Sequence, residues 1–465
     1  MKAKSIEVEV VQEKPLTAGE KKLLAQFEKD IHAAAEEARE GFQKMAMAFY
    51  QIKEQRLYRE HGTFTEYFQK VFGYGRSHAN RIADSGQVIE ELSPRGDILK
   101  KLDTESHYRP LTPLLKEPEK LEQVFDLLET WDAWTDSTVL PAGQVRAAKV
   151  FLTPPTEPVD QNGKENEIME KVTVLIEEAE AELPEGSPKE VRKIFQNLKA
   201  KAKSLAIRRT TKIAWTQHTW NPLQGCTRAS EGCDNCYAAK LLATRLADMY
   251  PDLAIMKKDG SYAFTGKILL LPGKLAEPLL NRTPRKYFVN SLSDLFHKGV
   301  PEKFISVVFD VMEKAHWHTF QVLTKRPERM AEFTQKRYKD CDAPSHIWLG
   351  TSTENQNRFD ERIKHLKKVK AAVRWLSCEP LIGPIKLTDM ADIDWVVVGG
   401  ESKGGRTMEK AWATSLRDQC AIAEIPFFFK QWGDFTEDAE HRKGREEGDA
   451  KLDGKIHHNY PEQKG

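Results

Sequence analysis

Trp220-Asn-Pro-Leu-Gln-Gly-Cys226 and Cys233-Asp-Asn-Cys236-Tyr237 are neighbouring parts of one short stretch, which holds three of the six cysteines of this 465-residue chain. The three thiols follow the spacing C-x6-C-x2-C. Thiolates this close together can bind one metal centre, and three of them leave one coordination position open for a substrate or cofactor. The stretch therefore predicts the reactive centre of an enzyme.

The residues around the cysteines leave several kinds of site open. We expect a first strand over 211–216 and a helix over 237–249, which would place Cys233 and Cys236 near a helix amino end that favours thiolates. From spacing alone, the site could be a [4Fe-4S] cluster, a structural zinc site with His218 or a distant fourth ligand, or a disulfide with a free thiol. The disulfide is disfavoured because a few clustered cysteines more often bind metal in a reducing compartment.

The composition is that of a soluble globular protein with no strong overall charge. Charged residues make up 30% and hydrophobic residues 40% of the chain, and the formal net charge is +1. Any contact with nucleic acid must therefore come from a local patch. The first residues lack the apolar run of a signal peptide, and no stretch is apolar for long enough to span a membrane, so we expect a cytoplasmic protein without a membrane partner. The scattered thiols expected to be buried or free are Cys341, Cys378 and Cys420.

Residues 1–152 predict a helical region with a candidate DNA-reading motif. A long helix over 18–60 is followed by an amphipathic helix over 64–71, with Gly73 where a C-cap would lie and Ser77 as the cap of a second helix. This order is the helix-turn-helix pattern, and a plain helical bundle with a solvated polar face fits the same spacing. The side chains of the second helix that could reach phosphates and base edges are Arg76, Ser77, His78, Asn80 and Arg81.

This region also resembles the helix-turn-helix domains of phage and plasmid proteins, including the ParB-like group. The resemblance covers residues 30–150 and rests on the segment from Gly62 to Ala83 and on Ser106-His-Tyr-Arg-Pro-Leu-Thr. It implies that DNA is a partner. Phosphate contacts near Arg76 and Arg81 would make the affinity dependent on salt.

Two segments are expected to lie outside the packed domains. Residues 153–207 begin with the proline-rich linker Thr153-Pro-Pro-Thr-Glu-Pro and continue as a charged helical hairpin over 164–207, which is a solvated connector or an interaction arm. Residues 434–465 are charged and rich in Gly and His, and we expect them to form a flexible tail.

Residues 208–433 alternate short apolar runs with amphipathic stretches, as repeated βα units do. The amphipathic stretches expected to form helices are 301–315, 355–367 and 411–423. Together with the helical N-terminal region, the pattern predicts an α+β multidomain chain with a βα, partial TIM-like barrel. The expected buried strands are Lys267–Leu271, Tyr287–Asn290, His318–Leu323, Ile347–Gly350, Val373–Ser377, Trp395–Gly399 and Pro426–Lys430.

Polar residues follow six of these strands in succession. Active sites of α/β barrels and sheets form at the carboxyl ends of the strands, so the series favours a rim around one ligand, although each residue alone could be a cap or a turn. Carboxylates can take an amine, a hydroxyl or a proton, and a lysine can hold an anion. On this basis the expected catalytic residues are Lys325, Glu354 and Glu379. The residues expected to bind a cofactor are Asn290, Ser291, Asp294, Thr324, Ser377, Gly399, Gly400 and Glu401.

The cysteine stretch resembles that of the radical S-adenosylmethionine superfamily, where a three-cysteine loop follows the first strand of a βα barrel. The first gap is longer here than in the usual C-x3-C-x2-C, whereas the final C-x2-C-Tyr agrees. Residues 211–433 resemble more closely a phage-associated family of largely uncharacterised three-cysteine proteins. The shared motifs stand at Trp220–Tyr237, Asn290–His297, Leu323–Arg329, Gly350–Asn355, Ser377–Pro384, Gly399–Ser402 and Lys430–Gly433.

These resemblances imply a [4Fe-4S] cluster on Cys226, Cys233 and Cys236, with S-adenosylmethionine on the fourth iron and its amino group near Glu401. One-electron cleavage of the sulfonium would yield a 5′-deoxyadenosyl radical that abstracts a hydrogen atom from the substrate. Since a DNA reader shares the chain, we expect modification or repair of nucleic acid, by a protein of phage or mobile-element origin. The alternative is a non-enzymatic DNA-binding or partition-type factor with structural zinc.

Overall fold

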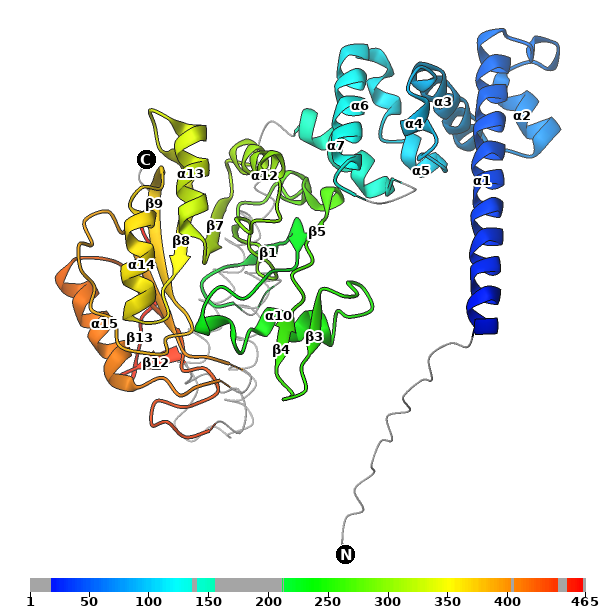
Figure 1. Cartoon of the computed structure of the whole chain (residues 1–465). Helices are drawn as coiled ribbons and strands as arrows, with labels where there is room; N and C mark the ends of the chain where they lie inside the picture. The colour runs from blue at the N-terminus through cyan, green and yellow to red at the C-terminus, as the bar shows by residue number, and fades with distance from the viewer. Residues whose placement is uncertain are drawn as a thin grey trace, which may run out of the picture. The chain divides into compact units, whose positions relative to one another are not determined.

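The chain divides into two compact units, Met1–Arg146 and Ala147–Gly465. Figure 1 shows helices in the first unit and a sheet with helices against it in the second, which confirms the predicted α+β class. None of the described helices is both long enough and apolar enough to cross a membrane. The predicted hairpin over 164–207 lies outside the described residues. The computed structural model describes residues 18–135, 140–154, 211, 213–402, 405–441 and 450–462.

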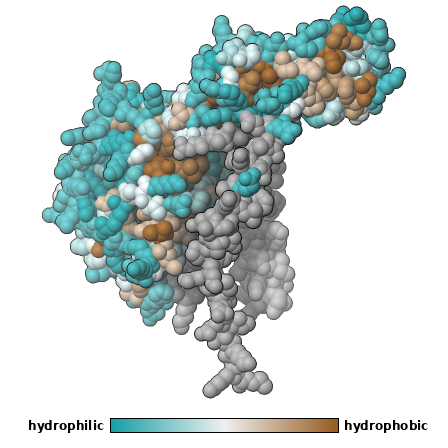
Figure 2. All heavy atoms as spheres, turned by 45° about the vertical axis from the view of Figure 1, so that its right-hand side comes forward, coloured by the Kyte–Doolittle hydropathy of each residue, from teal (hydrophilic) through white to brown (hydrophobic). Residues whose placement is uncertain are grey.

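The first unit is helical, as its sequence predicts. Apolar side chains that are partly exposed occur here, where Figure 2 shows brown patches, and they include Val71 and Phe72 of α2. The 3-10 turns are η1 (Arg59–His61) and η2 (Thr112–Lys116). The helices are α1 (Ala18–Glu54), α2 (Phe64–Phe72), α3 (Arg76–Leu92), α4 (Gly96–Leu99), α5 (Glu105–Tyr108) and α6 (Pro118–Asp132), and the boundary between the units falls within α7 (Ala142–Leu152).

The connection between α2 and α3 is set by local backbone chemistry. Thr63 and Glu66 form a capping box, in which each side chain accepts a hydrogen bond from the backbone N–H of the other residue. Gly73 ends α2 in the left-handed conformation (φ 75°), which confirms it as the C-cap. Gly75 is the N-cap of α3, so Ser77 lies inside the first turn, and the prediction that Ser77 caps this helix is wrong.

The contact between α1 and α3 depends on Gly86 of α3. A Cβ atom at this position would lie 2.1 Å from the backbone oxygen of Ala46 and 2.7 Å from Cβ of Tyr50. The two helix backbones can therefore approach closely only because residue 86 has no side chain.

Gly86→Ala should lower the free energy of unfolding of this unit by about 1–3 kcal/mol, because the added methyl group overlaps the α1 backbone. Gly41→Ala on α1 is the matched control, since no atom lies within 4 Å of its added Cβ. That variant should gain about 0.5–1 kcal/mol through helix propensity. Hydrogen exchange of α1 and α3 peptides in the full chain measures both changes, and equal protection in the two variants would contradict the close approach.

The second unit contains a seven-stranded parallel sheet curled into a half-barrel, with helices packed against one face (Figure 1). This confirms the predicted partial barrel. The helices are α12 (Glu302–Lys314), α13 (Pro327–Tyr338), α14 (Gln356–Leu366) and α15 (Lys410–Ile422). The strand order is β1 (His218–Trp220), β6 (Lys286–Val289), β7 (Thr319–Thr324), β8 (Ala343–Ser352), β9 (Ala371–Cys378), β10 (Trp395–Gly399) and β11 (Phe427–Gln431).

Two of the predicted strands are wrong. The first strand of the sheet is His218–Trp220 rather than 211–216, because the described residues 213–217 precede the strand and place Trp215 in the core. The apolar run over 267–271 does not enter the sheet; its β5 (Leu269–Leu270) pairs antiparallel with β2 (Leu223–Gln224). This run therefore supports the segment that leads to the cysteines.

The smaller elements surround the cysteine stretch. The helix that begins at Tyr237 ends at Ala243, earlier than the predicted 249. The elements are η3 (Glu231–Cys233), α10 (Tyr237–Ala243), the hairpin of β3 (Ala254–Met256) with β4 (Tyr262–Phe264), η4 (Pro272–Lys274) and α11 (Glu277–Leu280).

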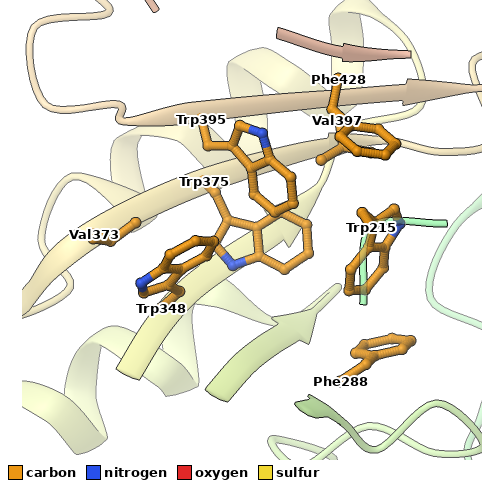
Figure 3. Packing of buried hydrophobic residues seen from close by; sticks show 8 residues of the cluster. All are labelled: Trp215, Phe288, Trp348, Val373, Trp375, Trp395, Val397 and Phe428. Carbon is orange, nitrogen blue, oxygen red and sulfur yellow. The ribbon is translucent and has the colours of Figure 1, made fainter. Parts of the chain in front are cut away.

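The core of the half-barrel is aromatic. Trp215 packs edge-on against Trp375, with ring centroids 5.4 Å apart, and Trp375 lies 5.2 Å from Trp395 (Figure 3). Gly350 faces Trp375, and an added Cβ there would lie 2.5 Å from the indole ring. Large rings thus fill the concave side. The buried cluster comprises Trp215, Phe288, Trp348, Val373, Trp375, Trp395, Val397 and Phe428.

The described C-terminal residues pack against this core. After the hairpin of β12 (Lys451–Leu452) and β13 (Lys455–Ile456), the chain runs along β11, where Phe429 N–H donates to the His457 oxygen at 2.8 Å. Tyr460 then stacks on Trp395, with ring centroids 5.4 Å apart. Residues 450–462 are therefore packed against the sheet, in contrast to the flexible tail that we expected.

Candidate active site at the cysteine loop

The three clustered cysteines line one pocket of about 140 Å³ at the carboxyl ends of β6 and β7. They lie on one loop, residues 226–236, which we call the cysteine loop. The apolar part of the wall includes Phe264, Phe288 and Leu323. Several residues that the sequence predicted for this site also line the pocket: Cys226, Cys233, Cys236, Asn290, Ser291, Asp294, Thr324 and Lys325.

The cysteine sulfurs are free thiols with hydrogen-bond donors directed at them. Cys236 is the N-cap of α10 and accepts from backbone N–H groups of that helix, and Cys233 accepts from Ala229 N–H at 3.5 Å. The guanidinium of Arg326 lies 3.8 Å from the Cys226 sulfur. Burial nevertheless raises the pKa of Cys226 to about 12 and also raises the pKa of Cys236. A metal cation in the pocket would supply the charge that ionises these thiols.

Glu354, which follows β8, is the central anchor of the cysteine loop. Its carboxylate is fully buried and accepts a hydrogen bond from Ser230 of the loop at 2.6 Å. Lys325 and Arg362 lie 3.0 and 2.8 Å from its two oxygens. Burial opposes ionisation, but these two cations outweigh it and lower the pKa of Glu354. Gly232 allows the loop to approach, since a Cβ there would lie 2.4 Å from Cγ of Glu354.

Arg326 and Asp294 hold the start of the loop. Arg326 pairs with Asp294 at 2.6 Å and donates to the backbone oxygen and hydroxyl of Thr227 at 3.1 and 2.9 Å. Asp294 also accepts from the Thr324 hydroxyl at 2.7 Å. Nε2 of His297 lies 2.9 Å from the hydroxyl oxygen of Thr227. The residue next to Cys226 is therefore fixed from two strand ends.

Two further ion pairs hold the middle and the end of the loop. Arg358 pairs with Glu231 at 2.9 Å, and this hydrogen-bonded pair lowers the pKa of Glu231 to about 2. Glu401 pairs with Arg406 at 2.6 Å and accepts from Asn235, which lies between Cys233 and Cys236, at 3.0 Å. Arg406 also donates to the backbone oxygen of Glu231.

These contacts assign different roles from those expected for several predicted residues. Glu401 does not line the cysteine pocket and holds the loop instead. Glu379 pairs with Lys430 at 2.7 Å and accepts from the Trp215 indole at 3.1 Å, also outside the pocket lining. Ser377 is buried and bonds Glu379 at 3.3 Å.

The predicted glycines serve close packing. An added Cβ would lie 2.7 Å from the Glu379 carboxylate at Gly399 and 2.2 Å from the Trp432 backbone oxygen at Gly400. Neither glycine lines the cysteine pocket. The two glycines in the sequence therefore mark places where the chain packs tightly, rather than places that contact a ligand.

The structure does not bring His218 to the cysteines. His218 begins β1, its ring centroid is 5.3 Å from that of Tyr287, and it is not part of the pocket wall. Among the described residues, no group of three or more His, Cys, Asp or Glu side chains is arranged to hold a metal ion.

Sequence reasoning missed four side chains that hold the loop: Thr227, Ser230, Arg358 and Arg406. Arg326 and Asn235 lie in the shared motifs Leu323–Arg329 and Trp220–Tyr237, but the sequence predicted no loop-holding role for either residue. The signal available for the two arginines was their place shortly after a motif carboxylate, Arg358 after Glu354 and Arg406 after Glu401. Their partners lie far away in the chain, so one sequence does not reveal the pairs.

The expected DNA-contacting side chains lie together on the amino half of α3. Arg81 donates to the Ser77 hydroxyl at 3.0 Å and lies 3.4 Å from a carboxylate oxygen of Glu105. Asn80 donates to the backbone oxygen of Arg76 at 2.9 Å. The exposed side chains are those of Arg76, Ser77, His78 and Arg81, and Asn80 is half-buried.

The fold and the pocket define a parallel half-barrel with a three-cysteine site at the carboxyl ends of its strands. Residues 210–461 match a family model described as "Protein of unknown function (DUF5131)". The match covers more than half of the 465 residues, so the chain belongs to this family. No curated protein and no solved structure matches the chain.

Glu354→Gln should lower the free energy of unfolding of the half-barrel by about 3–5 kcal/mol, because it leaves the buried Lys325 and Arg362 without a counter-charge. Glu361→Gln is the matched control on α14, since its carboxylate is half-exposed and pairs with Arg358 at the surface. The control should change stability by less than about 0.5 kcal/mol. Urea unfolding followed by tryptophan fluorescence compares the two, and a Glu354→Gln variant as stable as the control would disprove the anchoring role.

Proposed function

We propose that the chain is an iron–sulfur enzyme of the radical S-adenosylmethionine type that modifies or repairs nucleic acid. The observation that carries the proposal is the pocket lined by Cys226, Cys233 and Cys236 at the carboxyl ends of parallel strands. This edge is where α/β barrels and sheets place their active sites. Three thiols supply three ligands and leave one iron of a [4Fe-4S] cluster open for a small molecule.

The residues of the pocket fit such a group. Soft thiolates are the ligands that iron–sulfur clusters take, and N–H donors directed at the sulfurs tune them. Lys325 and Arg326 line the pocket and provide positive charge beside the cysteines. Asn290 lines the same pocket, and both polar atoms of its buried side chain lack a hydrogen-bond partner. The zinc alternative would need a fourth ligand other than His218, which lies outside the pocket wall.

The chemistry supplied by a bound cluster with S-adenosylmethionine is reductive cleavage of the sulfonium and hydrogen abstraction from a substrate. The chain itself holds the reactants in place. The cysteine loop is fixed by Glu354, Arg326 and Glu401, so its thiols keep a defined position. The aromatic core behind the pocket excludes water from one side.

Nucleic acid is proposed as substrate because a candidate DNA reader shares the chain. Helix α2, the turn at Gly73 and helix α3 follow the order of a helix-turn-helix motif, with Arg76 and Arg81 exposed on α3. Arginine side chains at the start of a recognition helix can contact phosphates and base edges.

Anaerobic reconstitution should yield about four iron and four sulfide per chain and absorbance near 400 nm, as a [4Fe-4S] cluster requires. Reduction with S-adenosylmethionine should then release 5′-deoxyadenosine. Cys233→Ala should abolish the cluster and the release of 5′-deoxyadenosine. Cys341→Ala, at an exposed cysteine outside the pocket, should leave the cluster and the product unchanged. Stoichiometric zinc without sulfide, or 5′-deoxyadenosine from the Cys233→Ala variant, would refute the proposal.

The double variant Arg76→Ala, Arg81→Ala should bind duplex DNA about tenfold or more weakly and with a smaller salt slope, because two phosphate contacts are lost. Arg146→Ala on α7 is the control, as an exposed arginine away from α3. Fluorescence anisotropy over a salt series measures the affinity. An unchanged affinity and slope in the double variant would remove the proposed reader.

A further inference from the structure

We propose that the carboxamide of Asn290 recognises the adenine ring of the nucleoside that binds in the cysteine pocket. The assignment rests on the proposed function and adds the group that selects the ligand's base. Asn290 is 2% exposed and lines the pocket, and neither Oδ1 nor Nδ2 of its side chain has a hydrogen-bond partner. Buried carboxamides almost always have partners, so this unpartnered acceptor and donor are available to a ligand of the pocket.

The backbone conformation at residue 290 explains why asparagine is tolerated there, but it does not explain why a carboxamide is present. The residue follows β6 in the left-handed conformation (φ 63°), and its N–H donates to the Trp220 oxygen at 2.8 Å. Asparagine tolerates this conformation, and glycine adopts it at no steric cost. The turn alone would thus be satisfied by glycine, and the buried carboxamide is an additional feature.

The polar neighbours of Asn290 are paired with one another. Ser291 exchanges hydrogen bonds with Asn221 at 3.1 and 3.2 Å. Asp294 accepts from Thr324 and pairs with Arg326. These groups fix the wall around Asn290, whose carboxamide belongs to a pocket-lining residue and has no partner among the described residues.

The geometry of a carboxamide selects the chemistry of that ligand. A planar pair of one donor and one acceptor complements the N7 and N6 edge of adenine, where an acceptor stands beside an amino donor. A carboxylate would satisfy only Nδ2, and a ribose hydroxyl presents no planar edge. Phe264, Phe288 and Leu323 form the apolar part of the same wall, against which a flat ring can pack. Adenine is the one part of S-adenosylmethionine with both properties.

The test uses the reconstituted full-length chain under anaerobic conditions, with titration calorimetry of S-adenosylhomocysteine and S-inosylhomocysteine. The inosyl ligand replaces the amino donor by a carbonyl oxygen, which Oδ1 of Asn290 would repel. Wild type should bind the adenosyl ligand about tenfold or more tightly than the inosyl ligand. Asn290→Gly keeps the backbone conformation and should bind both ligands with equal, weakened affinity.

Asn290→Asp provides a second variant of the same size, in which an acceptor replaces the donor that faces N7. It should lose about tenfold or more of its affinity for the adenosyl ligand. Iron content and melting temperature equal to wild type verify the fold of each variant. An Asn290→Gly variant that still prefers the adenosyl ligand, or an Asn290→Asp variant that keeps the wild-type affinity for it, would overturn the assignment of Asn290. Neither result would affect the proposed function. A wild-type holoprotein that binds neither ligand would overturn the proposed function together with the assignment.

Discussion

The position of the cysteine loop depends on a buried group of charges centred on Glu354. A carboxylate without solvent exposure lies between Lys325 and Arg362, and its remaining hydrogen bond comes from Ser230 of the loop. Removing three charges from water is costly unless each one is paired. The pairing is complete only when the loop is in place, because Ser230 completes the shell around the carboxylate. The loop, whose regular structure is one turn of 3-10 helix, thereby takes its conformation from the strand ends.

The strand-end residues therefore act mainly through the loop. The sequence suggested that Glu354 and Glu401 face a ligand, and both instead hold residues that lie between the cysteines. Side chains locked by ion pairs keep the groups that they support in one geometry, which is what a site built on a loop needs. The polar residues that line the pocket directly after β6 and β7 include Asn290 and Lys325.

The sequence predicted the parts that depend on local pattern and missed those that depend on distant pairs. The strands with long apolar runs and the cysteine cluster could be found because their signal is contiguous. The three-residue strand beginning at His218 has no such run, and the apolar run at Leu269 covers the loop rather than entering the sheet. Ser230 lies 124 residues from Glu354, and Asn235 lies 166 residues from Glu401. Many other arginines, serines and asparagines in the chain could have paired equally well on composition alone.

The two ends of the half-barrel differ in a way that limits how a substrate can approach. At the amino ends of the strands, Tyr460 stacks on Trp395 at the start of β10, and Lys286 at the start of β6 lies 4.3 Å from the same tyrosine ring. That end is filled by aromatic packing, and the cysteine pocket opens at the other end. A pocket of about 140 Å³ is too small to admit a double helix. On the proposed function, a nucleic-acid substrate would therefore have to present a single unstacked nucleotide, as enzymes that act on bases require.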